Sequence, residues 1–183
     1  MKVRRTDING VAVVETSPFI DRRGLFARLF CERELSEMLG GRHIVQANYS
    51  RTEVKGTIRG LHYQLPPHAE MKLVRCLRGR VWDIALDLRE GSPTFLDWHA
   101  EELTPENALM LVIPEGCAHG FQTLEPGSDL LYLHTALYEP AAESGVRADD
   151  PRLKINWPLP ITELSPRDQT PLWLSADFAG IAL

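Results

Sequence analysis

The segment RGLHYQLPPHAEMKLVRC, residues 59–76, gathers side chains that can move protons and hold negative charge. Arg59, His62, Tyr63 and Lys72 all lie within its first fourteen residues. A histidine, a lysine and a tyrosine on one face of a barrel would supply a base, a positive charge that stabilises developing negative charge, and an acid. Proton exchange beside a carbonyl group requires these three. A single histidine is usually structural and a lysine usually solvated, so the spacing indicates this chemistry without specifying it.

Two later segments with an alternating pattern add polar side chains to a predicted sheet. In residues 129–138 a period of two places Tyr132, His134 and Tyr138 on one face, opposite an apolar face. In residues 80–88 it places two carboxylates among small residues, opposite a wholly apolar face. Such a polar face suits either solvent or a polar cavity inside a barrel, and the pattern leaves both alternatives open.

The elements that would position these side chains are short strands separated by turns. Apolar or alternating runs cover residues 11–15, 72–77, 80–88, 108–113, 119–124 and 129–138. Many short strands at regular spacing are typical of a sandwich or a barrel. Arg78-Gly79, between two of these runs, predicts a hairpin turn.

The rest of the chain frames this barrel. Residues 32–39 have helical periodicity, and Gly40-Gly41 predicts where that helix ends. From Asp149 the sequence is irregular and rich in proline, so we expect this tail to wrap over the barrel instead of adding strands. A length of 183 residues suits one core and is short for two. We therefore expect a single domain over 1–183, with the barrel core at about 45–140.

Composition argues against several classes of protein. A net charge of −5 is unsuited to binding a nucleic-acid backbone, which needs a concentrated basic face. The N-terminal residues turn polar before a signal-peptide core develops, and no apolar run approaches membrane-spanning length. Three cysteines without a CxxC pair are typical of reduced thiols in a cytosolic protein. We predict a cytoplasmic protein that binds neither nucleic acid nor membrane.

Eight strings of residues carry a resemblance to a known family. They are DRRGLF (21–26), IRGLHYQLPP (58–67), KLVRC (72–76), VWDIALDLREGSPTF (81–95), IPEGCAHGF (113–121), LYLHTALYEP (131–140), DDPRLKINWP (149–158) and LSPRD (164–168). In their order and intervals they resemble the dTDP-4-dehydrorhamnose 3,5-epimerase family over almost the whole chain. RGLHYQ together with PEGxAHGF is specific for that family.

This resemblance implies a fold, a substrate and an assembly. The fold is all-β, a cupin-type jelly-roll barrel (double-stranded β-helix) with a short N-terminal extension and an irregular C-terminal tail. The substrate is a nucleotide-diphosphate 4-keto-6-deoxy sugar, of the dTDP-4-dehydro-6-deoxyglucose type, inverted at C3, C5 or both. The assembly that the resemblance implies is a homodimer that works without a metal ion or other cofactor.

The resemblance also implies roles for four catalytic side chains. His62 is the base that removes a proton beside the C4 ketone, and Asp168 holds its imidazole. Lys72 lies near the sugar carbonyl and stabilises the enolate, and Tyr132 returns a proton to the opposite face of the carbon. The implied substrate-binding residues are Arg23, Phe26, Arg28, Gln46, Asn48, Arg59, His119 and Tyr138. Of these, Arg23 reaches into the neighbouring subunit's site and Tyr138 lies near the nucleotide.

Metal catalysis is a competing interpretation, because cupin barrels often hold iron, manganese or zinc. A metal cupin normally presents an HxH pair, a glutamate a few residues on and a further histidine. No two of the six histidines here have HxH spacing, and Gln64 stands where a second ligand would follow His62. We predict that the site holds no metal.

Several positions depart from the family pattern. Leu133 replaces the lysine that usually follows the tyrosine, Glu70-Met71 replaces small or amide residues, and Arg28 replaces a glutamate. These departures leave open the nucleobase and the number of inverted carbons. Strict alternation also puts Arg59 and His62 on opposite strand faces, so the strand must bulge, as at Gly60, for both to reach one pocket.

Other functions remain as alternatives. One is a 3- or 5-mono-epimerase that acts on a differently based nucleotide sugar such as a CDP-sugar. Another is a non-epimerase cupin, either metal-dependent or sugar-binding. A ketoisomerase, which moves the carbonyl group, is a third, and the retained set of His62, Tyr132 and Asp168 argues against it.

Overall fold

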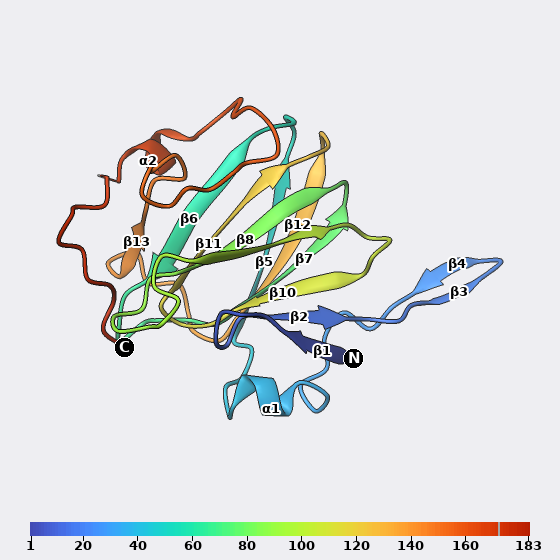
Figure 1. The fold of residues 1–183 in the computed structure, drawn as a ribbon. Coiled ribbons are helices and arrows are strands. Elements are labelled where there is room, and N and C mark those ends of the chain that lie inside the picture. The colour runs from blue at the N-terminus through green and yellow to red at the C-terminus, as the bar shows by residue number, and fades with distance from the viewer. Residues whose placement is uncertain (172) are drawn as a thin grey trace.

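The computed structural model describes residues 1–171 and 173–183 and consists of two antiparallel β-sheets packed face to face (Figure 1). The six-stranded sheet has the order β1 (Lys2–Arg5), β2 (Ala12–Glu15), β10 (Leu109–Ile113), β7 (Lys72–Arg78), β12 (Ser128–His134) and β5 (Gln46–Thr52). The five-stranded sheet has the order β13 (Glu143–Gly145), β6 (Ile58–Gln64), β11 (Cys117–Thr123), β8 (Val81–Asp87) and β9 (Trp98–Leu103). A separate hairpin pairs β3 (Phe19–Asp21) with β4 (Gly24–Phe26), and two short helices are α1 (Ser36–Leu39) and α2 (Pro166–Gln169).

Between β5 and β12 the chain crosses from one sheet to the other at almost every connection. The two sheets enclose an apolar core that includes Val74, Phe121 and Leu130. Crossing connections of this kind build a double-sheet jelly roll, which closes most of its edges by wrapping. The all-β, cupin-type jelly-roll barrel predicted from the sequence is confirmed.

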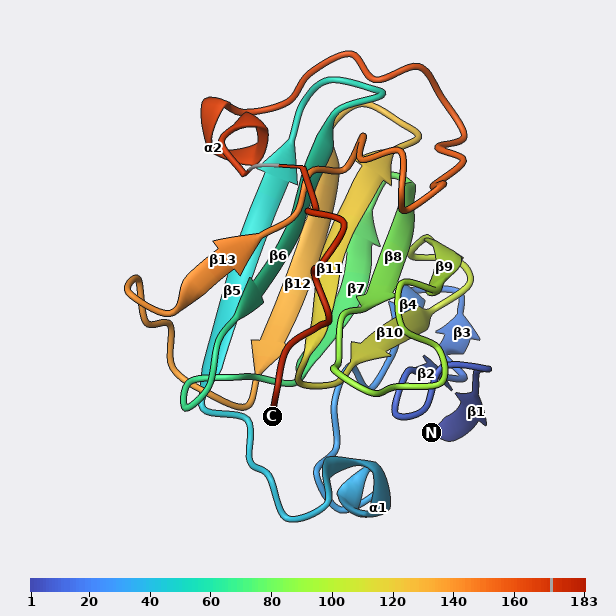
Figure 2. The ribbon, with the colours of Figure 1, turned by 60° about the vertical axis from the view of Figure 1, so that its left-hand side comes forward.

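The polar side of β8 faces the interior of the barrel. Ala85 belongs to the core between the sheets, and Asp83 is fully buried. Ile84 and Leu86, on the opposite face, pack under the C-terminal tail (Figure 2). The described residues of the tail from Asp149 cover that face without adding a strand, as expected. Of the two alternatives for residues 80–88, the structure selects the interior over solvent.

The hairpin predicted at Arg78-Gly79 is wrong. Strand β7 pairs with β10 and β12, whereas β8 pairs with β9 and β11 in the other sheet. Gly79 has the φ of 74° that a tight turn favours, so the turn itself is present. A tight turn reverses the chain but does not choose the strands' partners, and here it carries the chain from one sheet to the other.

Strand β12 ends at His134, before the predicted end at Tyr138. His134 lies opposite Gln46, the first residue of β5, and opposite Lys72, the first residue of β7. Because both neighbouring strands begin there, the ladder has no partner to continue with. Tyr138 therefore lies in the loop that follows and not on the strand face to which the alternation assigned it.

The helices are short. Helix α1 is confined to Ser36–Leu39 and ends at Gly40, which has the left-handed φ of 57° expected of a glycine stop. Leu35 and Leu39 pack against the outer face of the six-stranded sheet. Within the described ranges no helix is long and apolar enough to span a bilayer.

Candidate active site

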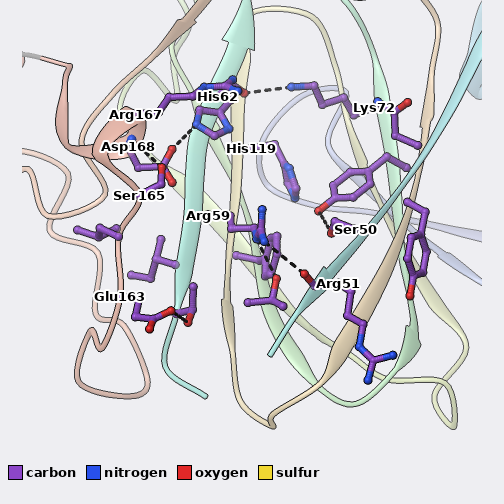
Figure 3. A pocket seen from close by; sticks show the side chains of 18 of the residues that line it. Ser50, Arg51, Arg59, His62, Lys72, His119, Glu163, Ser165, Arg167 and Asp168 are labelled. Atoms are coloured by element: carbon purple, nitrogen blue, oxygen red, sulfur yellow. Dashed lines mark hydrogen bonds and ion pairs between the residues drawn. The ribbon is translucent and has the colours of Figure 1, made fainter. Parts of the chain in front are cut away.

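A cavity of about 1500 Å³ is lined by strands of both sheets and by the segment around α2 (Figure 3). Residues from β5, β6, β7, β11 and β12 contribute side chains to its walls. The structure brings nine of the sequence-predicted site residues to this cavity: His62, Lys72, Tyr132, Asp168, Gln46, Asn48, Arg59, His119 and Tyr138.

A bulge in β6 places Arg59 and His62 on the same cavity. His62 lies opposite His119 and Gly60 lies opposite Gly120, so Leu61 is one residue more than β11 supplies. The extra residue shifts the alternation of side chains by one position, so Arg59 points to the same side of the strand as His62. The bulge predicted at Gly60 is confirmed.

His62 and Asp168 form an imidazole–carboxylate pair. The His62 Nε2 atom lies 2.6 Å from Asp168 Oδ1, and the Asp168 side chain is 4% exposed. Burial raises the pKa of Asp168, but the hydrogen bond and the charge of His62 outweigh it and hold the pKa below its usual range. Ser165 caps α2 by accepting a hydrogen bond from the Asp168 N–H at 3.1 Å, which fixes the carboxylate in place. An ionised carboxylate requires the proton on Nε2, so Nδ1 is the nitrogen that can accept one.

Tyr132 approaches the cavity from the six-stranded sheet, whereas His62 belongs to the five-stranded sheet. Its phenol oxygen lies 3.0 Å from Ser50 Oγ, and its ring packs edge-on against His119. Burial raises the pKa of Tyr132 above its usual value. The phenol therefore stays protonated at neutral pH and can donate a proton.

Lys72 reaches across the interior from one sheet to the other. Its Nζ donates to the backbone oxygen of His62 at 3.2 Å (Figure 3). The same Nζ lies 3.2 Å from Glu70 Oε1. The lysine is 8% exposed, and Glu70 supplies the negative charge that a buried ammonium needs.

A second buried imidazole–carboxylate pair joins His119 to Asp83. The His119 Nε2 atom lies 2.5 Å from Asp83 Oδ1, and burial raises the pKa of the fully buried Asp83 carboxyl. Within residues 1–171 and 173–183 the second oxygen of Asp83 finds no hydrogen-bond partner. This pair holds the His119 ring on the cavity wall.

Further polar side chains on the cavity wall are those of Arg59, Gln46 and Tyr138. Arg59 donates from Nε to Thr52 Oγ1 at 2.8 Å and from Nη2 to the Arg51 carbonyl at 3.3 Å. Tyr138, half exposed, donates its N–H to Gln46 Oε1 at 3.0 Å. Guanidinium and amide donors of this kind suit a phosphate-bearing ligand.

Three predicted binding residues lie away from this cavity. Arg23 is at the turn of the β3–β4 hairpin, which projects from the sandwich, and it bonds Asp21 (Figure 1). Phe26 is 74% exposed on the same hairpin. Arg28 follows the hairpin and pairs with Glu34. None of the three lines the cavity of its own chain.

The sequence did not identify several residues that line or support the cavity. Ser50 and Asp83 are the partners of predicted residues, and only the alternation in β8 indicated that Asp83 could face inward. Glu70 stood out only as a departure from the family pattern. Glu143 and Arg167 form an ion pair at the cavity wall. They belong to the short elements β13 and α2, whose sequences carry no periodic signal. In the part of the chain that the structure describes, no three His, Cys, Asp or Glu side chains are grouped to hold a metal ion.

The chain is similar to sugar-nucleotide epimerases along nearly its whole length. The family model described as dTDP-4-dehydrorhamnose 3,5-epimerase matches residues 5–175. The dTDP-4-dehydrorhamnose 3,5-epimerase of Shigella flexneri is 41% identical over 169 residues, which cover 92% of this chain and 93% of the relative. The dTDP-4-dehydrorhamnose 3-epimerase of Streptomyces niveus is 37% identical over 176 residues, covering 96% of this chain and 84% of the relative.

A solved structure extends the similarity to three dimensions. The dTDP-6-deoxy-D-glucose-3,5-epimerase of Legionella pneumophila Philadelphia 1, in complex with dTDP-4-keto-L-rhamnose, is 40% identical and has a TM-score of 0.87. The match covers 92% of this chain and 89% of that chain. Sequence, fold and cavity agree, and the chain belongs to the dTDP-4-dehydrorhamnose 3,5-epimerase family.

Proposed function

We propose that this chain epimerises a dTDP-linked 4-keto-6-deoxyhexose at C3, C5 or both, by removing and returning a proton through an enolate. One observation carries the proposal: the His62–Asp168 pair and Tyr132 approach one cavity from opposite sheets. Inversion needs a base and an acid on opposite sides of the sugar ring. The substrates named for the relatives support the choice of a dTDP-sugar.

His62 is the base of the proposed reaction. The C4 ketone acidifies the hydrogens on C3 and C5, and His62 Nδ1 takes one of them. Asp168, on Nε2, stabilises the imidazolium that forms and keeps the ring in one orientation. A proton-transfer group of this kind contributes on the order of 10²–10⁴ in rate.

Lys72 stabilises the enolate. An ammonium has three N–H donors, and here one is directed to the His62 carbonyl and one to Glu70. The third is left for the oxygen on C4, which becomes negative as the proton leaves. A buried cation next to that oxygen stabilises the transition state more than it would in water.

Tyr132 returns the proton. Its protonated phenol lies on the wall opposite His62, so the new C–H bond forms on the face from which no proton was taken. Ser50 holds the hydroxyl in place. The configuration at the carbon is thereby inverted.

The remaining polar side chains bind the nucleotide diphosphate. Arg59 provides the guanidinium for the diphosphate, with Gln46 and Asn48 beside it on the cavity wall. His119 faces the sugar, and Tyr138 at the open side contacts the nucleoside.

We further propose that the protein is a cytoplasmic homodimer of single-domain subunits. The exposed β3–β4 hairpin supports this, because Phe19 and Phe26 are 79% and 74% exposed. An isolated two-stranded hairpin is marginally stable in water, so an apolar one needs a surface to pack on. A second subunit would cover it and receive Arg23 in its cavity.

The test is incubation with dTDP-4-keto-6-deoxyglucose in D₂O, followed by NMR of the sugar. Deuterium at C3, C5 or both, together with the inverted product, is the expected result and also counts the inverted carbons. His62→Ala and Asp168→Asn are expected to lose at least ~10² and ~10-fold in kcat while still binding dTDP.

Three outcomes would favour other functions. Binding of the nucleotide sugar without deuterium uptake would indicate a binding module. Movement of the carbonyl group to C3 would indicate a ketoisomerase. Deuterium at a single carbon would indicate a mono-epimerase, like the 3-epimerase of Streptomyces niveus.

A further inference from the structure

A chain of hydrogen bonds runs along the six-stranded side of the cavity, and the mechanism above gives no role to His134 and none to Glu70 beyond accepting from Lys72. It begins at Lys72, whose Nζ lies 3.2 Å from Glu70 Oε1. The other Glu70 oxygen, Oε2, accepts from His134 Nδ1 at 2.7 Å. The His134 Nε2 atom lies 3.2 Å from Asn48 Nδ2. Asn48 Oδ1 in turn accepts from Gln46 Nε2 at 3.2 Å.

Every donor in this hydrogen-bond chain points toward Glu70, Lys72 from one side and His134, Asn48 and Gln46 in turn from the other. Because an ionised carboxylate can only accept, both Lys72 and His134 must donate to Glu70. With its proton on Nδ1, His134 leaves Nε2 as an acceptor, and only the amide N–H of Asn48 can supply a donor. The Asn48 oxygen then faces the Gln46 amide, which donates. Each orientation follows from the one before it. The ionised Glu70 carboxylate therefore fixes which atom donates in every bond of this hydrogen-bond chain.

Burial makes the hydrogen bonds of this relay energetically costly to break. The side chains of Lys72, Glu70 and His134 are 10%, 7% and 9% exposed. Burial raises the pKa of Glu70, but the hydrogen bond of His134 and the charge of Lys72 outweigh it and lower the pKa overall. The His134 ring also stacks at 6.2 Å on the Tyr132 ring, two residues earlier on the same strand face. An unpaired charge left in this environment would be strongly unfavourable.

We propose that Glu70 and His134 are positioning residues: through one relay they orient the Lys72 ammonium toward the enolate oxygen and the Asn48 amide toward the bound nucleotide sugar. The role rests on the epimerase function proposed above. Glu70 occupies one donor of Lys72, so that the free N–H points into the cavity. His134 keeps the Asn48 side chain from rotating, although Asn48 itself is exposed to the cavity.

Two substitutions of His134 separate the two ends of the relay. Asparagine can place an N–H close to the position of Nδ1 but has no group at Nε2, so His134→Asn keeps the bond to Glu70 and loses Asn48. Glutamine reaches the position of Nε2 and loses the Nδ1 donor, so His134→Gln keeps Asn48 and loses Glu70. We expect His134→Asn to raise KM about tenfold with kcat within about twofold of wild type. We expect His134→Gln to lower kcat about tenfold with a smaller change in KM.

Glu70→Gln tests the centre of the relay. The two carboxylate oxygens face different donors, and a glutamine turns its NH₂ group toward either Lys72 or His134. One of the two bonds is lost, so kcat is expected to fall at least about tenfold. The matched control is His99→Asn. His99 makes a similar imidazole–carboxylate contact, 3.0 Å to Glu101, but lies outside the cavity. It is expected to leave both kcat and KM within about twofold of wild type.

A measurement that needs neither substrate nor variant completes the test. Two-dimensional ¹H–¹⁵N NMR of the wild-type imidazoles is expected to show His134 as the Nδ1–H tautomer. The Nε2–H tautomer would overturn the relay. His134 variants that fold, but in which kcat falls and KM rises together in proportion to their loss of stability, would also overturn it. If the wild type fails to exchange deuterium, the epimerase function fails, whereas the tautomer still reports on the relay. If the wild type is active and all three cavity variants match it, the relay alone is wrong.

Discussion

Gly60 on β6 and Gly120 on β11 meet backbone to backbone, so that a Cβ on Gly60 would lie 2.6 Å from the Gly120 Cα. Gly60 also has a φ of 127°, which side chains rarely adopt. The contact occurs at the bulge that brings Arg59 and His62 to one cavity. The placement of Arg59 and His62 on one cavity therefore depends on two residues that have no side chains.

Gly60→Ala is expected to lower the free energy of unfolding by about 1–3 kcal/mol, because the new methyl group meets backbone that cannot move aside. It should also lower kcat/KM by at least ~10-fold through displacement of His62. Urea unfolding and steady-state kinetics measure the two effects. The control is Gly41→Ala, at a φ of 85° with nothing within 4 Å of the new atom. An active, fully stable Gly60→Ala protein would contradict this account.

Tyr132→Phe should separate proton removal from proton return. The ring packing against His119 is kept, whereas the proton donor is lost. The rate of deuterium exchange into the substrate should therefore fall less than the rate of epimer formation. Both rates can be read from the same NMR experiment in D₂O. Ser50→Ala keeps the Tyr132 phenol but removes its hydrogen-bond partner, so it should lower the rate of epimer formation less than Tyr132→Phe does. A parallel loss of exchange and epimerisation would show that Tyr132 does not act as the acid alone.

Asp87 should stabilise the fold in a pH-dependent way. Burial raises the pKa of its carboxyl, but hydrogen bonds from Arg89, Ser92 and Thr94 outweigh it and lower the pKa from 3.8 to about 2. Because the folded-state pKa is the lower one, the stabilisation is present above pH ~4 and is lost as the pH falls through about 2. It corresponds to about 2 kcal/mol, which Asp87→Asn should lose at pH 7.

Urea unfolding between pH 7 and pH 3 measures the Asp87 effect. The difference between wild type and Asp87→Asn should narrow as the pH falls below 4. The exposed Asp97 provides the control, since Asp97→Asn should change stability by less than about 0.5 kcal/mol. A gap that stays constant with pH would rule out the ionised carboxylate as its source.

The subunit should sediment as a homodimer at micromolar concentration. Phe26→Asp places a charge on the exposed apolar face of the β3–β4 hairpin and should shift the protein toward the monomer. Activity should fall with it, because each cavity would then lack the partner's Arg23. Leu183→Asp changes a similarly exposed residue, 66% exposed at the C-terminus, and should leave the dimer intact. A wild type that sediments as a monomer and is fully active would contradict the proposed homodimer.

Arg28 does not line the cavity of its own chain, so in the proposed dimer it should influence the choice of nucleobase in the partner's cavity. The resemblance implies an acidic residue at this position, which could accept the imide N–H of thymine, whereas an arginine has five donors and no acceptor. Competitive binding of dTDP, CDP, UDP and GDP to the wild type and to Arg28→Glu measures the preference. We expect the variant to move toward dTDP relative to CDP. An unchanged order of preference would mean that Arg28 does not contact the base.

The amino-acid sequence was enough to predict the kind of barrel and most of the side chains that line its cavity. A period of two decides which side chains share a strand face, so Tyr132 and His134 could be placed together and Arg59 could be recognised as out of phase with His62. That mismatch predicted the bulge at Gly60, because one extra residue is the simplest way to change faces. The motif strings supplied Asp168, which no periodicity would have linked to His62.

Tertiary structure alone decided which distant groups touch. Glu70 and His134 are 64 residues apart, and they meet because β7 and β12 pair in one register. Lys72 reaches His62 only because the two sheets pack face to face. The turn at Gly79 shows the limit most clearly: its local geometry was predictable, but strand partners depend on the burial of whole faces, a property that no short segment contains.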